Sequence, residues 1–599
     1  MPQLRSGARL RPALAAELLF ALLVVGTVAA FFLTTRVKRE APVVEGLRFD
    51  SHLSPNGDGR HDITDISFRI KRDDEVSVSI LDADGNEVRE VAVDRSVEKG
   101  RHAFRWNGRT DSGRVAADGA YEVRIGLRRQ GRSLTAQRRV FVDTEPPVPV
   151  VRSVSPAFIS PDGAGGSERA TLVFDGPRRS IPTLLVYRTD AAKPRLVAQR
   201  RGVRDTGRLT WDGRVGPPGR RHPAAPGGYA MLVRIADAAG NVGPPRLPPV
   251  RGDVPGHPGV VVRYVSAVPP AAPVAAGAVA SFQIQAEGRR YRWSLRRLGS
   301  SRSVARGRSR AATLRVRAPK GRSGVLVLRL EVGGHRYFTP FAVQGPRRRA
   351  VLLVLPATTW EARNELDSDR DGFPDVLPAQ SAVALRRPLL GRGLPALFTS
   401  EIAPLLLDLD AKRRRFDVTT DLALARAGAR IPRRYKGVLF AGSPRFYTAG
   451  AARLARSFVQ GGGTLCWVGT DGFTREVSLS PKTVDLAGRR TSLAGNVFGE
   501  RLSPNRSGGP LTVLGDSIGF FAGFGSLGSF PALERSAAAP RGARLLASAG
   551  DRPGQPALTV YGLGRGTLVR VGVRGFGRAA RSSPVVARIM RSLWTSLSR

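Results

Sequence analysis

The sequence predicts a multidomain protein: an N-terminal transmembrane helix, then all-β immunoglobulin-like sandwiches, then a C-terminal flavodoxin-like three-layer α/β domain. Three observations predict this fold class. A charge-free apolar run opens the chain, landmark residues recur after about 105 residues between 44 and 255, and apolar strands alternate with helical patterns after Ala350. At 599 residues the chain is too long for one hydrophobic core, so several domains are expected.

The composition is that of a globular protein, but the charge balance is strongly basic. Apolar residues make up 42% and charged residues 24%, whereas the net charge is +46 and nearly all of the 95 basic residues are arginine. The arginines are spread along the chain, so we expect no nucleic-acid partner. Two interpretations stay open: solvated faces of biased composition, or attraction to anionic cell-wall polymers, carbohydrate or lipid head groups. The single cysteine excludes an intramolecular disulfide.

The N-terminal segment is interpreted as a membrane anchor. Residues from Leu18 to Leu33 carry no charge, and Ala13 to Ala16 extend this stretch to about membrane-spanning length. Residues 1–40 would then be a cytoplasmic tail and a signal-anchor, with the protein a single-pass protein of the cell membrane and the bulk of the chain extracytoplasmic. The alternative is a cleaved signal peptide with a small-residue site at Val28 to Ala30. Both interpretations predict export.

Residues 44–146 and 147–255 are predicted to be two copies of one β-sandwich. The recurring landmarks are SPNG at Ser54 and SPDG at Ser160, W-[ND]-G-R at Trp106 and Trp211, and G-x-Y ending at Tyr121 and Tyr229. Short alternating strands with turn signals in a unit of about 100 residues are typical of an immunoglobulin-like sandwich. The motifs resemble the FlgD-type Ig-like repeat of exported bacterial proteins. Residues 256–346 are expected to form a third β-sandwich.

Residues 349–599 are predicted to be the α/β domain, organised around a βαβ unit at Lys436 to Val468. An apolar strand ends at Gly442, a helical pattern follows, and three glycines at 461–463 stop the helix before the next strand. Ligands of such sheets sit at the carboxyl ends of the strands. We therefore expect a ligand pocket there, with these candidate residues: Asn364, Asp421, Ser443, Arg445 and Tyr447.

Several segments of this part of the chain resemble the large (β) subunit of N,N-dimethylformamidase. They are SGVLVLRLEVGGHRYFTPFAV (323–343), VLPATTWEARN (354–364), FDVTTDLAL (416–424) and VLFAGSPRFYT (438–448). The resemblance spans roughly residues 260 to 599. It implies a sandwich followed by an α/β domain related to glutamine amidotransferases. It also implies hydrolysis of a small amide at an iron held by tyrosines and a glutamate, with a histidine nearby.

The residues that would carry this activity are replaced. Where the family has Gly-His-x-Glu-Tyr, this chain has Gly442, Ser443, Pro444, Arg445 and Phe446, and the family's Tyr-Asn is here Arg363-Asn364. An arginine is a permanent cation and cannot hold a metal. All six histidines precede the α/β domain, so no Ser-His-Asp machinery can be assembled within it. We therefore expect a protein that is not an enzyme and that holds no iron.

Two stretches of alternating oxygen-bearing side chains suggest calcium. Asp367, Asp369, Asp371 and Asp375, with Gly372 at the sharp turn, match the first part of a calcium loop, although the acid expected at its end is missing. The other interpretation of this loop is an aspartate-rich polar turn. A weaker calcium candidate is formed by Asn56, Asp58 and Asp62, for which a plain Asx-type turn is favoured.

The function predicted from these observations is binding. The chain would be a membrane-anchored extracellular protein whose Ig-like spacers present a dimethylformamidase-β-like module of the cell envelope, with calcium as its cofactor and no catalysis. The first alternative is an amide or related hydrolase with a rearranged site using carboxylates such as Glu361, Asp421 or Asp471. The second is a purely structural envelope component.

Overall fold

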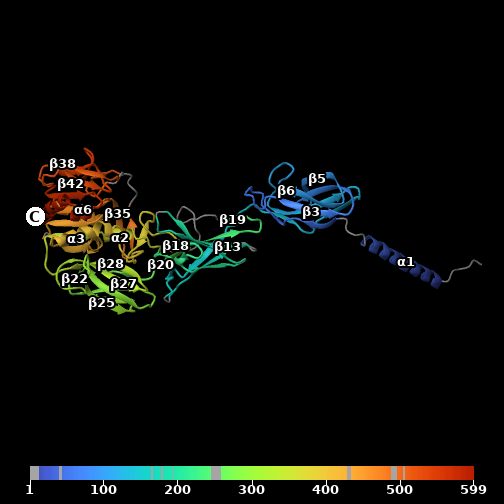
Figure 1. Ribbon diagram of the computed structural model, residues 1–599, viewed down its shortest axis with the longest axis horizontal. Helices are drawn as coiled ribbons and strands as arrows, with labels where there is room; N and C mark the ends of the chain where they lie inside the picture. The colour runs from blue at the N-terminus through green and yellow to red at the C-terminus, as the bar shows by residue number, and fades with distance from the viewer. Residues whose placement is uncertain are drawn as a thin grey trace, which may run out of the picture. The chain divides into compact units, whose positions relative to one another are not determined.

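The computed structural model describes residues 12–38, 44–163, 166–176, 180–191, 193–204, 206–243, 258–427, 434–487, 495–503 and 506–599 (Figure 1). The chain forms two compact units. The first comprises Met1–Pro147 with Ala236–Gly243, and the second Val148–Ile235 with Pro244–Arg599.

The expected membrane anchor is wrong. Helix α1 covers Pro12–Lys38, but no helix within the described ranges is long and apolar enough to cross a membrane. The physical reason is length: the charge-free run of α1 from Leu18 to Leu33 is about 24 Å long at ~1.5 Å per residue, against about 30 Å of bilayer hydrocarbon. The predicted location, as a single-pass protein of the cell membrane, depended on this anchor and is therefore also wrong. The expected cytoplasmic tail before Pro12 lies outside the described residues.

The first β-sandwich packs two sheets around one core. Its strands are, in one sheet, β1 (Val44–Arg48), β3 (Thr64–Ile70) and β6 (Gly100–Trp106), and in the other β2 (His52–Leu53), β9 (Val140–Val142), β7 (Gly119–Leu127), β4 (Asp74–Leu81) and β5 (Glu87–Val97), with β8 (Arg132–Thr135) beside β7. Alternate residues point inward, as Ile66, Phe68 and Ile70 do from β3. The alternation therefore places one face of strands such as β3 and β7 in the core.

The second β-sandwich has the same strand order. One sheet holds β10 (Val150–Ser155), β12 (Ala170–Asp175) and β15 (Arg208–Trp211), and the other holds β11 (Phe158–Ile159), β20 (Gly259–Val262), β18 (Gly227–Ala236), β13 (Ile181–Arg188) and β14 (Arg195–Arg201). In both sandwiches a two-residue strand pairs in parallel with the last strand. That last strand, β20, follows residue 255, where we expected the second copy to end. The intervening residues 244–257 lie outside the described ranges.

The landmark residues make the same contacts in both sandwiches. The Trp106 indole donates a hydrogen bond to a backbone carbonyl three residues on, and its ring lies 5.5 Å from that of Tyr121. Trp211 and Tyr229 repeat this arrangement, with ring centroids 5.1 Å apart. Each tyrosine hydroxyl donates to the carbonyl four residues before it, at 2.8 Å. The duplicated motifs therefore specify one core contact and one backbone tie in each copy.

The glycine of each W-[ND]-G-R motif touches the proline of the SP motif in the same copy. Gly108 has φ +67°, and a Cβ there would come 2.6 Å from Pro55; Gly213 also has φ +67°, with 2.3 Å to Pro161. Only glycine tolerates this left-handed backbone together with such an approach. The two motifs recur together because they pack against each other.

Residues 266–344 form a third pair of sheets. The three-stranded sheet contains β21 (Ser266–Val268), β23 (Val279–Gln285) and β26 (Thr313–Arg317), and the five-stranded sheet contains β22 (Val274–Ala275), β28 (His335–Gln344), β27 (Gly324–Val332), β24 (Tyr291–Arg297) and β25 (Ser303–Ser309). Their core includes Phe282 and Phe341, whose rings meet edge to face at 5.0 Å.

The C-terminal region contains a mixed nine-stranded sheet. In spatial order its strands are β31 (Asp417–Thr420), β29 (Val351–Leu355), β32 (Gly437–Ala441), β34 (Thr464–Val468), β43 (Gly566–Val571), β42 (Pro556–Leu563), β41 (Arg544–Gly550), β38 (Gly509–Asp516) and β39 (Ser526–Phe530). The strands from β31 to β43 run parallel, and those beyond β43 pair antiparallel.

The predicted fold class with a flavodoxin-like α/β domain is wrong. The structure is mostly β-sheet, with 44% strand and 14% helix, whereas a flavodoxin-like domain alternates each strand with a helix. The antiparallel part is the physical reason. Antiparallel neighbours can be joined by tight turns, as β42 and β43 are at Gly564, so no crossover helix is required.

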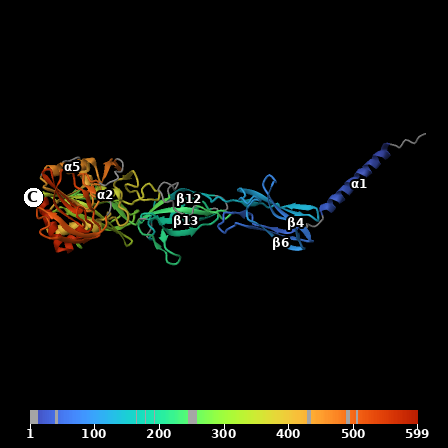
Figure 2. The same ribbon diagram turned by 90° about the horizontal axis from the view of Figure 1, so that it is seen from above.

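Helices nevertheless cover both faces of the parallel strands. On one face lies α5 (Ala449–Gln460), which is labelled in Figure 2. This helix buries Ala452, Ala455 and Val459 against the sheet. The other face is covered by η1 (Phe398–Ile402), α3 (Ala403–Ala411), α6 (Phe576–Ser582) and α7 (Pro584–Ser598). Because both faces are buried, the central strands are apolar runs.

Shorter elements lie beside the nine-stranded sheet. They are the helices α2 (Ala357–Ala362) and α4 (Asp421–Ala427), a small sheet of β30 (Ala382–Ala384), β36 (Thr483–Leu486), β35 (Arg475–Leu479) and β33 (Phe446–Tyr447), and the pair β37 (Arg501–Leu502) and β40 (Ser536–Ala538). The loops that join these elements to β29, β32 and β34 form the carboxyl edge of the parallel strands.

Candidate functional site

The backbone at the carboxyl edge is held in a tight arrangement by two glycines. Gly442 directly follows β32 with φ +107°, and Gly469 directly follows β34 with φ +133°. A Cβ on Gly469 would lie 3.2 Å from the backbone of Gly442, so the two strand ends approach as closely as glycine permits. The Ser443 hydroxyl donates a hydrogen bond to the carbonyl of Thr470 and ties the two loops together.

A cluster of opposite charges fills this edge. Asp471 accepts two hydrogen bonds from the Arg506 guanidinium, and the Arg445 guanidinium lies 4.0 Å from the same carboxylate. Glu534, fully buried, accepts the backbone N–H of Asp471 at 2.8 Å and lies 3.3 Å from Arg506. The cluster is therefore two guanidiniums interleaved with two carboxylates, in a fork geometry suited to strong pairing.

The pKa shifts follow from burial and pairing. Burial by itself raises the pKa of Asp471, but its hydrogen bonds to Arg506 and the charge of that residue outweigh burial, so the pKa is below its ordinary value. Burial raises the pKa of Glu534. Burial lowers the pKa of Arg445, and the nearby charges of other arginines add to this effect. Asp471 is thus held as an anion between cations, and it is a poor general acid or base.

The cavity beside this cluster has a volume of only about 20 Å³. Its lining includes Trp360, Arg363, Ser443, Thr470 and Arg574. A volume of this size holds about one water molecule. The edge where a parallel sheet usually binds its ligand is therefore filled by this chain's own side chains.

The structure does not bring the five candidate pocket residues together. Asn364 is buried, where its amide donates to the carbonyl of Pro388 and accepts from the N–H of Leu390, both at 3.0 Å. Asp421 and Tyr447 line a second small cavity, of about 30 Å³. Ser443 lines the cavity of about 20 Å³, and Arg445 faces Asp471. Of the five, only Asp421 and Tyr447 line the same cavity.

Asp421 begins helix α4 and is buried. Its carboxylate accepts the backbone N–H groups of Thr358 at 2.9 Å and Leu422 at 2.7 Å. Its other oxygen has no hydrogen-bond partner within the described part of the chain. Burial raises the pKa of Asp421 to about 7, and the backbone donors only partly offset it.

We expect Asp421 to make the protein less stable as pH rises. Because its pKa is higher in the folded state than in the unfolded state, the free energy of unfolding falls between about pH 4 and about pH 7, by a few kcal/mol in total. Asp421→Asn keeps an acceptor for the backbone donors and should remove this part of the pH dependence. Urea unfolding from pH 4 to pH 8 measures it, with the exposed Glu476→Gln as control. An unchanged slope in Asp421→Asn would contradict the expectation.

The aspartate loop brings three of its four candidate calcium ligands together. One carboxylate oxygen each of Asp367, Asp369 and Asp375 lies within 4.8 Å of the others, and Asp367 and Asp375 are buried. Burial, followed by the neighbouring carboxylates, raises the pKa of Asp367 to about 8. The fourth candidate, Asp371, accepts the backbone N–H of Phe373.

Other groups of the protein already neutralise part of this loop. The buried guanidinium of Arg387 lies 3.3 Å from Asp375, and the Gln380 amide donates to both Asp369 and Asp375, at 2.9 and 2.8 Å. A calcium ion would have to displace the amide of Gln380. Calcium binding at this loop therefore stays a prediction.

The weaker calcium candidate has the bonds of a turn. Asp62 accepts the backbone N–H groups of Gly57 at 2.7 Å and Gly59 at 2.6 Å, and Asn56 accepts that of Asp58 at 2.9 Å. The bond that Asn56 accepts from the N–H two residues on is that of an Asx-type turn, whereas Asp62 accepts from N–H groups that precede it. Calcium binding at these residues stays a prediction, as does the plain-turn interpretation.

Comparison with protein families identifies two parts of the chain. Residues 308–495 match the family described as N,N-dimethylformamidase beta subunit-like, C-terminal. The C-terminal part contains a dimethylformamidase-β-like region. Residues 64–131 match the FlgD Ig-like domain. Both resemblances drawn from the sequence are confirmed. No curated protein matches the chain.

Solved structures give only distant likenesses. A β-galactosidase from Rahnella sp. R3 is 16% identical with a TM-score of 0.24, and the match covers 32% of this chain and 26% of that one. A β-galactosidase from Bacillus circulans sp. alkalophilus is 15% identical with a TM-score of 0.21 and the same coverages. The native conformation of E. coli alpha-2-macroglobulin is 12% identical with a TM-score of 0.18, over 50% of this chain and 22% of that one. This chain thus spans about a quarter of each of those proteins, and the likenesses carry no functional argument.

The residues at the family's iron positions do not fit a metal ion. Ser443 donates to a backbone carbonyl, Arg445 faces Asp471, and Phe446 is fully buried. Arg363 lies close enough to lower the pKa of Arg445 further. Cations stand where a cationic metal would bind, so we derive no iron chemistry for the dimethylformamidase-β-like region.

Sequence reasoning missed the residues that close the carboxyl edge. Arg506 and Glu534 come from segments far along the chain, on either side of β38 and β39. The sequence did contain a signal for another buried charge, because Arg570 is a charged residue inside the apolar run of β43. A charge in a strand that is buried on both faces requires a buried partner. That signal identifies the need for a partner, but not the partner.

Proposed function

We propose that the chain is a non-catalytic binding protein in which Ig-like domains accompany a dimethylformamidase-β-like region that has lost its chemistry. The observation that carries the proposal is the charge cluster at the carboxyl edge. Arg445 stands at the position of the family's glutamate and pairs with Asp471, which also forms an ion pair with Arg506. The neighbouring cavity holds about one water, so an amide substrate has no room beside these groups.

The class of ligand that we propose is anionic. The net charge of +46 gives the protein a positive field that attracts anions and raises their local concentration. An anionic polymer or carbohydrate fits this field, and arginine forks bind carboxylate and phosphate groups in a bidentate manner. Binding of this kind requires no catalytic group at the carboxyl edge.

The test is an assay for hydrolysis of N,N-dimethylformamide by the purified chain, with and without added iron(II). We expect no release of dimethylamine above the blank and no stoichiometric iron by elemental analysis. The triple variant Ser443→His/Arg445→Glu/Phe446→Tyr, which restores the family's residues, is the matched comparison for metal uptake. Turnover by the unaltered chain together with one iron per chain would contradict the proposal.

A second candidate function is hydrolysis that uses Glu361. Burial raises the pKa of Glu361 to about 7, which is suited to a general base at neutral pH. Glu361 lines a cavity of about 80 Å³ with Pro270, Phe341, Trp360 and Arg387, and one of its carboxylate oxygens has no hydrogen-bond partner within the described ranges. Turnover of small ester or amide substrates that Glu361→Gln abolishes would favour this candidate over the binding function.

A further inference from the structure

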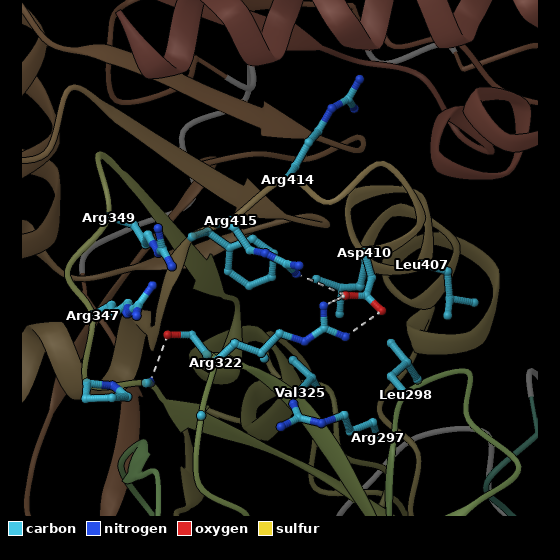
Figure 3. Close-up of a pocket in the computed structure, with 17 residues that line it drawn as sticks. Arg297, Leu298, Arg322, Val325, Arg347, Arg349, Leu407, Asp410, Arg414 and Arg415 are labelled. Atoms are coloured by element: carbon cyan, nitrogen blue, oxygen red, sulfur yellow. Dashed lines mark hydrogen bonds and ion pairs between the residues drawn. The ribbon is translucent and has the colours of Figure 1, made fainter.

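A larger cavity, of about 360 Å³, lies away from the carboxyl edge, between the third sandwich and the nine-stranded sheet (Figure 3). Its walls come from the end of β24, the start of β27, residues 345–349 and the segment from α3 to Phe416. The volume is in the range of small-molecule sites. None of the candidate residues expected from the sequence lines it.

Arginine dominates the lining of this cavity, hereafter the arginine pocket. Its lining contains six arginines and one acidic residue, Asp410; the arginines are Arg297, Arg322, Arg347, Arg349, Arg414 and Arg415. So many guanidiniums around one cavity repel each other unless anions lie between them. The pocket therefore has a strong preference for anions.

The protein's own carboxylates satisfy only part of this charge. Asp410 is bound by the Arg322 fork, with nitrogen–oxygen distances of 2.8 and 3.1 Å, and lies 3.8 Å from Arg415. Arg414 points away from Asp410 in Figure 3 and pairs with Asp408 at 3.0 Å. Asp410 and Asp408 together thus form ion pairs with three of the six arginines.

The other three arginines have no such partner. The side chains of Arg297, Arg347 and Arg349 make no ion pair or hydrogen bond within the described part of the chain. Arg297 is half-buried, and burial lowers its pKa; the charge of Arg322 adds to this effect, and the charge of Asp410 partly offsets it. A half-buried guanidinium without an anion is unfavourable, and a bound anion would relieve it.

Part of the lining of the arginine pocket is apolar, and this part is called the apolar wall. It is made of Leu298, Val325, Leu406, Leu407 and Phe416. A fully solvated inorganic ion gains nothing from such a wall, whereas a molecule with an apolar body and an anionic group contacts both parts. The lining thus fits a small amphipathic anion better than a bare ion or a long polymer.

We propose that the arginine pocket binds a small phosphate monoester whose organic body packs on the apolar wall. A phosphate monoester carries about −1.5 to −2 charges and three strong acceptor oxygens, which three free guanidiniums can share. A monocarboxylate brings one charge and two oxygens and leaves at least one guanidinium unpaired. This inference rests on the proposed binding function and names its site and ligand class.

The experiment is isothermal titration calorimetry of the full chain at low salt with phenyl phosphate, inorganic phosphate and benzoate. We expect phenyl phosphate to bind about tenfold more tightly than either comparison ligand, because only it offers both the dianion and the ring. Raising the salt concentration should weaken binding, since charge pairing is screened. Equal binding of benzoate and phenyl phosphate would overturn the assignment to phosphate.

The site is tested by the double variant Arg347→Ala/Arg349→Ala. It should weaken phenyl phosphate binding about tenfold or more, because it removes two of the three free forks. The matched control Arg310→Ala/Arg315→Ala removes the same charge from exposed positions outside the pocket and should change the Kd less than about twofold. Circular dichroism of both variants checks that each is folded.

The remaining outcomes separate this inference from the proposed function. If both double variants weaken binding equally, the attraction is a general field effect; the arginine pocket is then refuted as the site, while the binding function stands. The same conclusion follows if polyphosphate binds and phenyl phosphate does not. If the chain hydrolyses N,N-dimethylformamide at an iron centre, the binding function fails on the separate assay described above.

Discussion

Replacing Arg570 by methionine is expected to lower the free energy of unfolding by about 3–5 kcal/mol. Arg570 lies in β43, in the middle of the nine-stranded sheet, and its side chain is fully buried. Its guanidinium lies 2.9 Å from Glu500, which is fully buried as well, and donates to the carbonyls of Glu534 at 2.7 Å and Pro556 at 3.1 Å. The variant would leave the Glu500 charge buried beside an apolar side chain.

Urea unfolding of the single and double variants measures this cost. Glu500 also accepts hydrogen bonds from Tyr561 at 3.2 Å and Asn496 at 2.9 Å, which cannot replace an opposite charge. The double variant Arg570→Met/Glu500→Gln removes both charges and should be less destabilised than Arg570→Met alone. Strictly additive effects of the two substitutions would show that the charges are not coupled, which is contrary to the geometry.

Trp467→Ala is expected to cost about 3–5 kcal/mol for a different reason. Trp467 lies in β34 and is fully buried on the face of the sheet that α5 covers. Its ring lies 5.5 Å from that of Phe473 and 5.9 Å from that of Phe498. Its indole nitrogen lies 2.3 Å from where a Cβ on Gly472 would be. Truncation would leave a cavity that these aromatic rings cannot fill without moving.

The matched variant is Trp467→Phe. The Trp467 indole N–H is buried and has no hydrogen-bond partner among the residues the structure describes. Phenylalanine keeps much of the aromatic packing and removes that unsatisfied donor, so its cost should be clearly smaller than that of alanine. Thermal unfolding by circular dichroism would compare the two, and equal destabilisation would contradict an explanation based on packing.

Patterns that are local in the sequence predicted local structure well. The SP, W-[ND]-G-R and G-x-Y landmarks identified a repeated unit, and in both copies the tryptophan and tyrosine pack together. This worked because a glycine with positive φ, or a tyrosine bonded four residues back, depends on neighbours along the chain. The segments resembling dimethylformamidase were sufficient to recognise that family, because a family is recognised from short motifs that follow one another in order.

Features that depend on length or on distant pairing were predicted less well. The apolar run of α1 resembled a membrane span, but the described helix is not long and apolar enough. Alternation of strands and helices suggested a flavodoxin-like domain, but the strands beyond β43 in the sheet (β42, β41, β38 and β39) pair antiparallel instead. The apolar pattern of a buried strand is the same in parallel and antiparallel sheets when both faces are covered, so it could not distinguish them.

The sequence by itself determined many of the strands, the duplicated sandwich and the two family resemblances, because each of these depends on residues that lie close together in the chain. Only the tertiary structure decided which charges meet. Arg506 reaches Asp471, Arg570 reaches Glu500, and the six arginines of the arginine pocket converge from four separate segments. The physical reason is that ion pairs form across strands and loops whose spatial order is set by sheet topology, and that order cannot be read from the periodicity of any one strand.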